Sequence, residues 1–187
     1  MDSTVFSQSN RLTDCTDDLD RKDIPSLIKE LSNTDSLIRN VARDVLSCLG
    51  ARAVPELLKA LPTADTQLRW QIIKIFDRIQ DKSTIPIMIK ELMDDNSEIR
   101  WAAANALLNL RRDGLPALME ALTHDFDSIW LRQSAHHILR ILRDNGKLTP
   151  TEEQVYQALG DIEPAISVPW AAIKALNEIN KNKNLLP

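Results

Sequence analysis

Glycine and most aromatic side chains are scarce in this sequence of 187 residues, which contains four glycines, three phenylalanines and one tyrosine. Residues that favour strands never alternate with polar residues over a useful length, so an extended β-sheet is not expected. Leu, Ile, Ala and charged residues dominate instead, and such a composition favours helices. The length is sufficient for one domain with a continuous core.

Cysteine is also scarce, and the positions of Cys15 and Cys48 suggest neither a disulfide framework nor a zinc site. No apolar run approaches the roughly 20 residues of a membrane span, and the first ten residues lack the features of a secretory signal. We therefore expect a cytoplasmic protein. Acidic residues outnumber basic ones by 27 to 23, a balance that argues against broad binding to nucleic acid.

Motifs for catalysis, cofactors or metals are missing as well. The three histidines are His124, His136 and His137. The last two are adjacent and point about 100° apart on a helix, and no HExxH or CxxC spacing occurs. Glycine-rich phosphate loops and a nucleophile elbow are also missing from the sequence. The sequence thus predicts no catalytic residue, no metal site and no cofactor.

What the chain does contain is an internal repeat. Four segments begin with an apolar residue and a proline, and each has a leucine six residues after the proline. The prolines recur about every 30 residues, within the range of helical repeats. Proline is tolerated in the first turn of a helix, and the apolar positions around it form one buried stripe. The segments are 24–31 (IPSLIKEL), 54–61 (VPELLKAL), 85–92 (IPIMIKEL) and 115–122 (LPALMEAL).

A polar turn and a second predicted helix follow each of these segments. The second helix begins near an arginine, which is Arg39, Arg69, Arg100 or Arg132. Positions +3, +6, +7 and +10 from that arginine are apolar in all four repeats and form the expected core stripe. A degenerate fifth unit follows, because PWAAIKAL at 169–176 repeats RWAAANAL at 100–107. We expect its helices at about 151–160 and 168–180.

The unit resembles the HEAT repeat, and its short period is similar to the bacterial subtype called phycobilisome-lyase-type HEAT-like repeats. The resemblance covers roughly residues 24–180. It implies an all-α fold, an α-solenoid of antiparallel helix pairs in a right-handed superhelix, with four regular repeats and a degenerate C-terminal cap repeat. The second helices would line its concave side. The sequence further predicts an acidic, disordered N-terminal arm at 1–23 and a frayed tail at 181–187.

The resemblance also implies a role for the charges in the turns. In such repeats, an aspartate of the turn and the arginine of the second helix form a ladder between neighbouring units. Asp35, Asp65 and Asp95 match the first position, and the four arginines match the second. These charges are therefore expected to be structural and are not assigned to a functional site.

Helix geometry identifies the surface of the second helices that faces away from the core. At 100° per residue, position +1 lies opposite the core stripe, flanked by +5 and +8. Trp70, Trp101 and Trp170 all occupy +1, whereas Trp130 is expected in the core. Tryptophan is typical of interface hot spots, although it also serves to wedge neighbouring repeats together. The predicted partner-binding residues are Trp70, Lys74, Trp101, Asn105, His137 and Arg140.

These features predict a non-catalytic scaffold, adaptor or assembly factor that binds another protein on its concave face, and not an enzyme. Two alternatives remain. Resemblance to the lyase-type subtype implies a bilin lyase or chaperone-like subunit acting on phycobiliproteins, with the same aromatic and basic residues lining a tetrapyrrole groove. A HEAT-like DNA-binding protein would need a face rich in Lys and Arg, but Asp44 and Asp77 interrupt the basic residues there.

Overall fold

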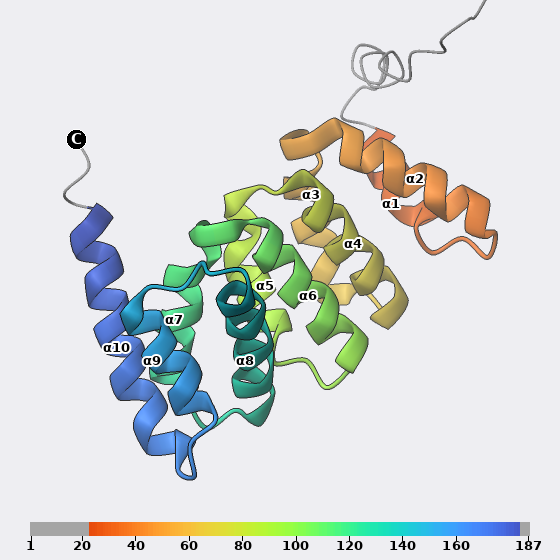
Figure 1. Ribbon diagram of the computed structural model, residues 1–187. Coiled ribbons are helices and arrows are strands. Elements are labelled where there is room, and N and C mark those ends of the chain that lie inside the picture. The colour runs from red at the N-terminus through yellow and green to blue at the C-terminus, as the bar shows by residue number, and fades with distance from the viewer. Residues whose placement is uncertain (1–22, 184–187) are drawn as a thin grey trace, which may run out of the picture. The chain divides into compact units, whose positions relative to one another are not determined.

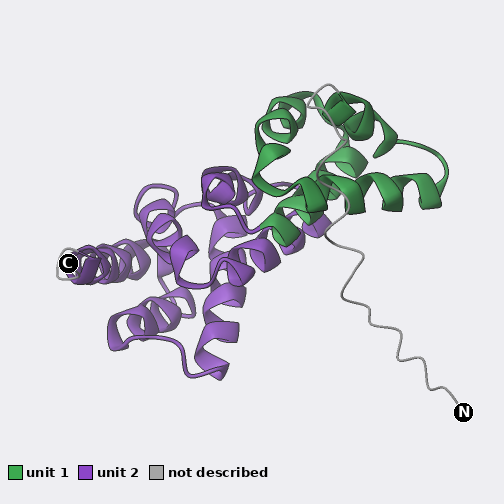
Figure 2. Ribbon diagram, turned by 90° about the horizontal axis from the view of Figure 1, so that it is seen from above, with its two compact units in different colours: residues 1–79 green, residues 80–187 purple. Residues whose placement is uncertain are grey.

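The computed structural model describes residues 23–183, in which the chain forms ten α-helices and no strand (Figure 1). The contacts divide the chain into two compact units, residues 1–79 and residues 80–187 (Figure 2). Apart from Asp23, the predicted acidic arm lies outside the described residues, as do residues 184–187 of the predicted frayed tail.

Unit 1 consists of two helical hairpins whose helices form two layers. Helix α1 packs against α3, and α2 packs against α4. The first helices of the pairs therefore form one layer and the second helices form the other. The helices are α1 (Ile24–Glu30), α2 (Ser36–Leu49), α3 (Val54–Ala60) and α4 (Thr66–Ile79).

Unit 2 consists of three hairpins. Helix α5 packs against α7, and α6 packs against α8, so its first two hairpins repeat the two-layer arrangement. The prediction of an all-α solenoid of stacked helix pairs is thus confirmed. The helices are α5 (Ile85–Glu91), α6 (Ser97–Asn109), α7 (Leu115–His124), α8 (Ile129–Asp144), α9 (Pro150–Leu159) and α10 (Pro164–Lys183).

The repeat pattern correctly predicts where the helices begin and what they bury. Proline occupies the first turn of α1, α3, α5 and α7, where no backbone N–H is needed. The predicted core positions of α2, α4, α6 and α8 are fully buried except Val45 and Ile79, which are half-buried. Burial of this apolar stripe supplies the main force that holds the pairs together.

The last hairpin departs from the regular order. Helix α9 packs against α8, and α10 packs against both α9 and α7 (Figure 1). Although α9 is the first helix of its pair, it therefore extends the layer of second helices, and α10 extends the layer of first helices. The equivalence of 169–176 with 100–107 predicted the opposite placement for α10 and is wrong in this respect.

An ion pair holds the start of α9 in this arrangement. Arg112, in the turn before α7, donates from Nη2 to Oε1 of Glu152 at 2.5 Å and from Nη1 to the carbonyl oxygen of Lys147 at 3.1 Å. Glu152 is fully buried and also accepts from the backbone N–H of Thr149, completing a capping box. These contacts fix the first turn of α9 beside the turn that connects α6 with α7.

Three arginines of the second helices, Arg39, Arg100 and Arg132, donate to carbonyl oxygens of their own repeats. Nη1 of Arg39 donates to the carbonyl oxygens of Asn33 and Thr34 at 2.7 and 2.9 Å. Arg100 makes the same pair of contacts with the carbonyl oxygens at 94 and 95, and Arg132 donates to that of Phe126. Each arginine thus satisfies carbonyl groups left without partners after the first helix.

The aspartates of the turns act as helix caps. Asp35 accepts from the N–H of Leu37, and Asp65 accepts from the N–H of Leu68, both at 2.8 Å. In the third repeat the capping residue is Asn96, which follows Asp95. These hydrogen bonds lie within each repeat, and the ladder between neighbouring units stays a prediction.

Candidate protein-binding surface

Helix α6 combines a closely packed backbone with one exposed tryptophan. Ala102, Ala103, Ala104 and Ala106 are buried, and their small side chains allow neighbouring helices to approach closely. Trp101 is 57% exposed among them. The prediction that position +1 faces away from the core is therefore confirmed for Trp101, which is held on a rigid helix at the surface of unit 2.

Asn105 follows Trp101 by one turn of α6 and is half-buried. Its Nδ2 donates to the carbonyl oxygen of Trp101 at 2.9 Å. The side chain therefore lies along its own helix beside the tryptophan. This contact belongs to the local structure of α6 and fixes the rotamer of Asn105.

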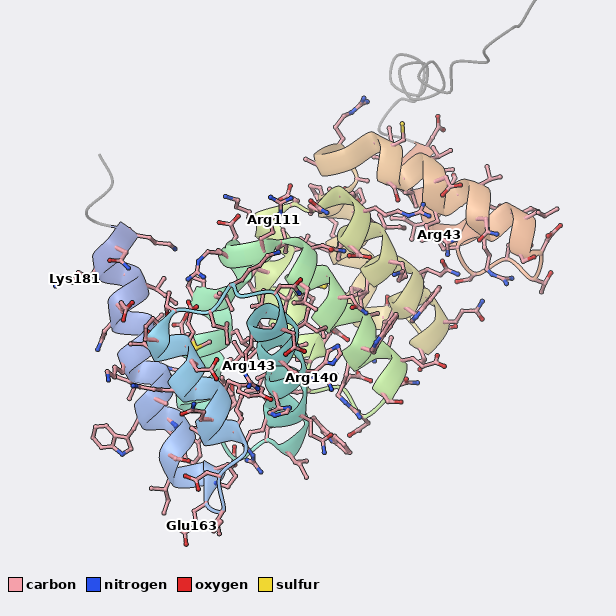
Figure 3. The ribbon with its side chains drawn as sticks, in the orientation of Figure 1. Arg43, Arg111, Arg140, Arg143, Glu163 and Lys181 are labelled. Carbon is pink, nitrogen blue, oxygen red and sulfur yellow. The ribbon has the colours of Figure 1, made fainter. Side chains whose placement is uncertain are left out.

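Helix α8 packs against α6 and carries His137 and Arg140. Arg140 is exposed and is seen on α8 in Figure 3. His137 is half-buried, and its Nε2 atom is buried without a hydrogen-bond partner among the described residues. Burial lowers the pKa of His137, and the positive charges of Arg140 and His136 lower it further. The imidazole is therefore neutral at pH 7.

Trp70 and Lys74 belong to unit 1, on helix α4. Trp70 is half-buried. Nζ of Lys74 lies 3.2 Å from Oδ2 of Asp77, one turn further along the same helix, and both side chains are partly buried. Lys74 is thus engaged in an ion pair within α4. The aromatic ridge expected from Trp70 and Trp101 on adjacent repeats stays a prediction.

The two remaining tryptophans differ from the prediction, Trp170 in the layer that its helix joins and Trp130 in its burial. Trp170 is 75% exposed, but it lies on α10 and not in the layer that contains α6 and α8. Trp130 is half-buried instead of lying in the core, and the guanidinium of Arg100 lies 4.0 Å from its ring centroid. That cation–π contact joins the starts of α6 and α8.

Two exposed apolar surfaces were not predicted from the sequence. One lies on the first hairpin, where Leu37, Ile38 and Val41 are exposed beside a groove of about 250 Å³ that Leu27 and Glu30 also line. The other lies on the last hairpin and consists of Ile162, Ile166, Trp170 and Ile173. The signal for the second was its spacing of three to four residues, but the sequence analysis placed only Trp170 of these four opposite the core.

The described part of the chain contains no group of three or more His, Cys, Asp or Glu side chains placed to hold a metal ion. Within residues 23–183, every helix is too short or too polar to cross a membrane. The arrangement on α6 and α8 offers one large apolar side chain with polar groups beside it. This is the composition of a contact surface for another molecule.

Comparison with known families identifies the class of repeat. Residues 54–140, from α3 to α8 and just under half of the chain, match the family model described as HEAT repeats. This span contains the most regular helix pairs of the chain, and these pairs are similar to HEAT repeats. The phycobilisome-lyase-type subtype is not confirmed. No curated protein and no solved structure matches the chain at a significant level.

Proposed function

We propose that this protein is a non-catalytic interaction scaffold, acting as an adaptor or assembly factor, and that it binds a partner protein through α6 and α8. The observation that carries the proposal is the exposure of Trp101 on a helix that is otherwise largely buried. HEAT repeats commonly serve as scaffolds for protein interaction, and Trp101 lies inside the matched residues.

The exposed area of Trp101 is large enough to anchor a complex. An exposed fraction of 57% corresponds to about 130 Å² of mostly apolar surface. At about 25 cal/mol per Å², covering this area contributes about 3 kcal/mol. A contribution of that size is typical of an interface hot spot. The position of Trp101 on a packed helix also limits the entropy lost when a partner orders it.

The neighbouring polar residues supply the rim that such a hot spot needs. Arg140 is exposed on α8 and carries a positive charge, so it favours an acidic patch on the partner. His137 is neutral at pH 7, and its buried Nε2 atom has a hydrogen-bonding capacity that no described residue uses. Together, Trp101 and Arg140 favour a partner that offers an apolar pocket beside an acidic group.

Affinity purification with the full chain as bait tests the proposal. Three baits are compared in lysate of the source organism: the wild type, Trp101→Glu, and Trp170→Glu as a matched control with an exposed tryptophan on another helix. We expect a discrete partner that Trp101→Glu loses and Trp170→Glu retains. With that partner purified, Trp101→Ala should weaken binding by about 2–3 kcal/mol, or roughly 30- to 150-fold.

Circular dichroism and thermal melting establish that each bait is folded. If folded Trp101→Glu and the wild type capture the same proteins in equal amounts, the α6–α8 surface is not the binding site. An eluate with visible absorbance, or phycobiliproteins among the captured proteins, would instead support the bilin-related alternative.

A further inference from the structure

Helix α10 and the turn before it carry an exposed apolar stripe, defined by Ile162, Ile166, Trp170 and Ile173. Their exposed fractions are 97%, 62%, 75% and 43%. The last three fall within about 60° of the helix circumference. Exposed apolar surface of this extent usually marks a contact surface. The stripe leaves roughly 500–600 Å² of largely apolar surface, as large as the biggest patches of typical monomers.

Charges along the stripe are divided by sign between its two ends. Asp161 and Glu163 lie at the start of α10, whereas Lys174, Lys181 and Lys183 lie in its second half. Figure 3 shows Glu163 and Lys181 at opposite ends of this helix. No charged residue occurs between 164 and 173. The stripe is therefore apolar in the middle, acidic at one end and mainly basic at the other.

We propose that the stripe binds a second copy of this chain, with the two α10 helices antiparallel about a two-fold axis at the level of Val168. In this register, Ile166 lies opposite Trp170 of the second copy. Ile162 lies opposite the region of Ile173. Because the two-fold axis repeats each contact, the four apolar residues of one copy cover the same four residues of the other.

Charge complementarity selects this arrangement. With the two-fold axis at Val168, Glu163 of one copy lies level with residues 173 and 174 of the other. It therefore forms an ion pair with Lys174 of the second copy. The symmetry produces this ion pair twice. A parallel arrangement would place Glu163 against its own equivalent and Lys174 against its own, which is repulsive. The only acidic residue in the second half of α10, Glu178, is half-buried on the side that faces Arg112 across a hollow of about 290 Å³.

The size of the stripe sets the expected affinity. Two copies would bury roughly 1,100 Å² in total, at the low end of specific interfaces, so we expect a reversible dimer with a dissociation constant on the order of micromolar. Lys174 also contacts Gln154 of α9, with Nζ donating to Oε1 at 3.0 Å. This contact holds the ammonium group beside the stripe. The dimer does not depend on partner binding by α6 and α8.

Sedimentation velocity of the full chain tests the proposal over about 1–200 μM, a range that brackets a micromolar dissociation constant. The wild type should change from monomer to dimer, and Trp170→Glu should raise the dissociation constant at least about tenfold. Trp101→Glu, which changes an exposed tryptophan outside the stripe, is the matched control and should dimerise like the wild type. A wild type that stays monomeric, or a dimer that persists in folded Trp170→Glu, overturns the proposal.

Charge reversal tests the antiparallel register independently of the apolar contacts. Glu163→Lys and Lys174→Glu should each weaken the dimer, because each creates two pairs of like charge. The double variant should restore dimerisation towards the wild-type value, since both pairs are then re-formed with exchanged signs. Failure of the double variant to recover while its circular dichroism matches the wild type would exclude this arrangement of the two helices.

Discussion

The ion pair between Arg112 and Glu152 should be one of the largest single contributions to the stability of unit 2. Glu152 is fully buried at the start of α9, and the Arg112 guanidinium approaches its two carboxylate oxygens at 2.5 and 3.3 Å. The substitution Arg112→Ala removes this partner. It leaves the carboxylate in a buried site where the backbone N–H of Thr149 still donates to it.

The expected decrease in the free energy of unfolding follows from the contacts that Arg112→Ala removes. Removing one partner of a buried ion pair costs about 3–5 kcal/mol, but the Arg112 side chain is 55% exposed. Water can therefore reach the carboxylate once the arginine is gone, and the expected loss falls to about 2–3 kcal/mol, as for a hydrogen bond to a charged group. Loss of the contact with the Lys147 carbonyl oxygen acts in the same direction.

The free energy of unfolding from urea titration measures the effect. Arg143→Ala is the matched control, because Arg143 also joins α8 to α9, but its pair with Glu153 is longer, at 3.3 Å, and neither partner is fully buried. That change should cost at most about 1 kcal/mol. Equal effects of the two substitutions, or a loss below about 1 kcal/mol for Arg112→Ala, would refute the argument from burial.

Two further predictions concern the backbone and the histidine. Gly50 has φ 59° and ψ −138°, and an added Cβ would meet nothing within 4 Å. Gly50→Ala should therefore lower the free energy of unfolding by about 2 kcal/mol through backbone strain alone. Gly160→Ala, at φ −97°, is the control and should change the midpoint of urea unfolding little. Because the pKa of His137 is lowered, the unfolded chain binds more protons than the folded one between that pKa and about 6.5. Stability should therefore fall as the pH decreases through this window, and His137→Gln should reduce the slope of unfolding free energy against pH; equal slopes would contradict the assignment.

The regular part of the fold was predictable because it depends on local and periodic features. Proline in the first turn and a recurring apolar stripe specify a helix and its buried face without reference to distant residues. The positions of Leu46, Phe76, Leu107 and Leu139, all at +7, illustrate this, since each is buried in its own repeat. Sequence reasoning therefore gave the helix pairs and most of the core.

The placement of the last hairpin could not be predicted from the same features. The sequence around Trp170 copies that around Trp101, yet α10 joins the other layer. The layer of a helix depends on tertiary contacts, and the pair of Arg112 with Glu152, which are 40 residues apart in the chain, is one such contact at the start of α9. A repeat pattern carries no information about such a pair.

The candidate site was predictable only in part, for a related reason. Trp70 and Trp101 occupy the same repeat position, but the first is half-buried and the second is exposed. Helix geometry gives the direction of a side chain relative to its own core, whereas burial depends on the neighbours it meets. Lys74 shows the same limit, because its pair with Asp77 engages a charge that was expected to serve a partner.

The exchange of layers in the last hairpin also affects how unit 2 forms. In the regular part of unit 2, the first helix of one pair, α5, is covered by the first helix of the next pair, α7. In the last hairpin it is the second helix, α10, that covers α7, and it begins 40 positions after α7 ends. During synthesis, α7 therefore remains incompletely covered until α10 has left the ribosome. We expect this delay to make the last two hairpins fold together.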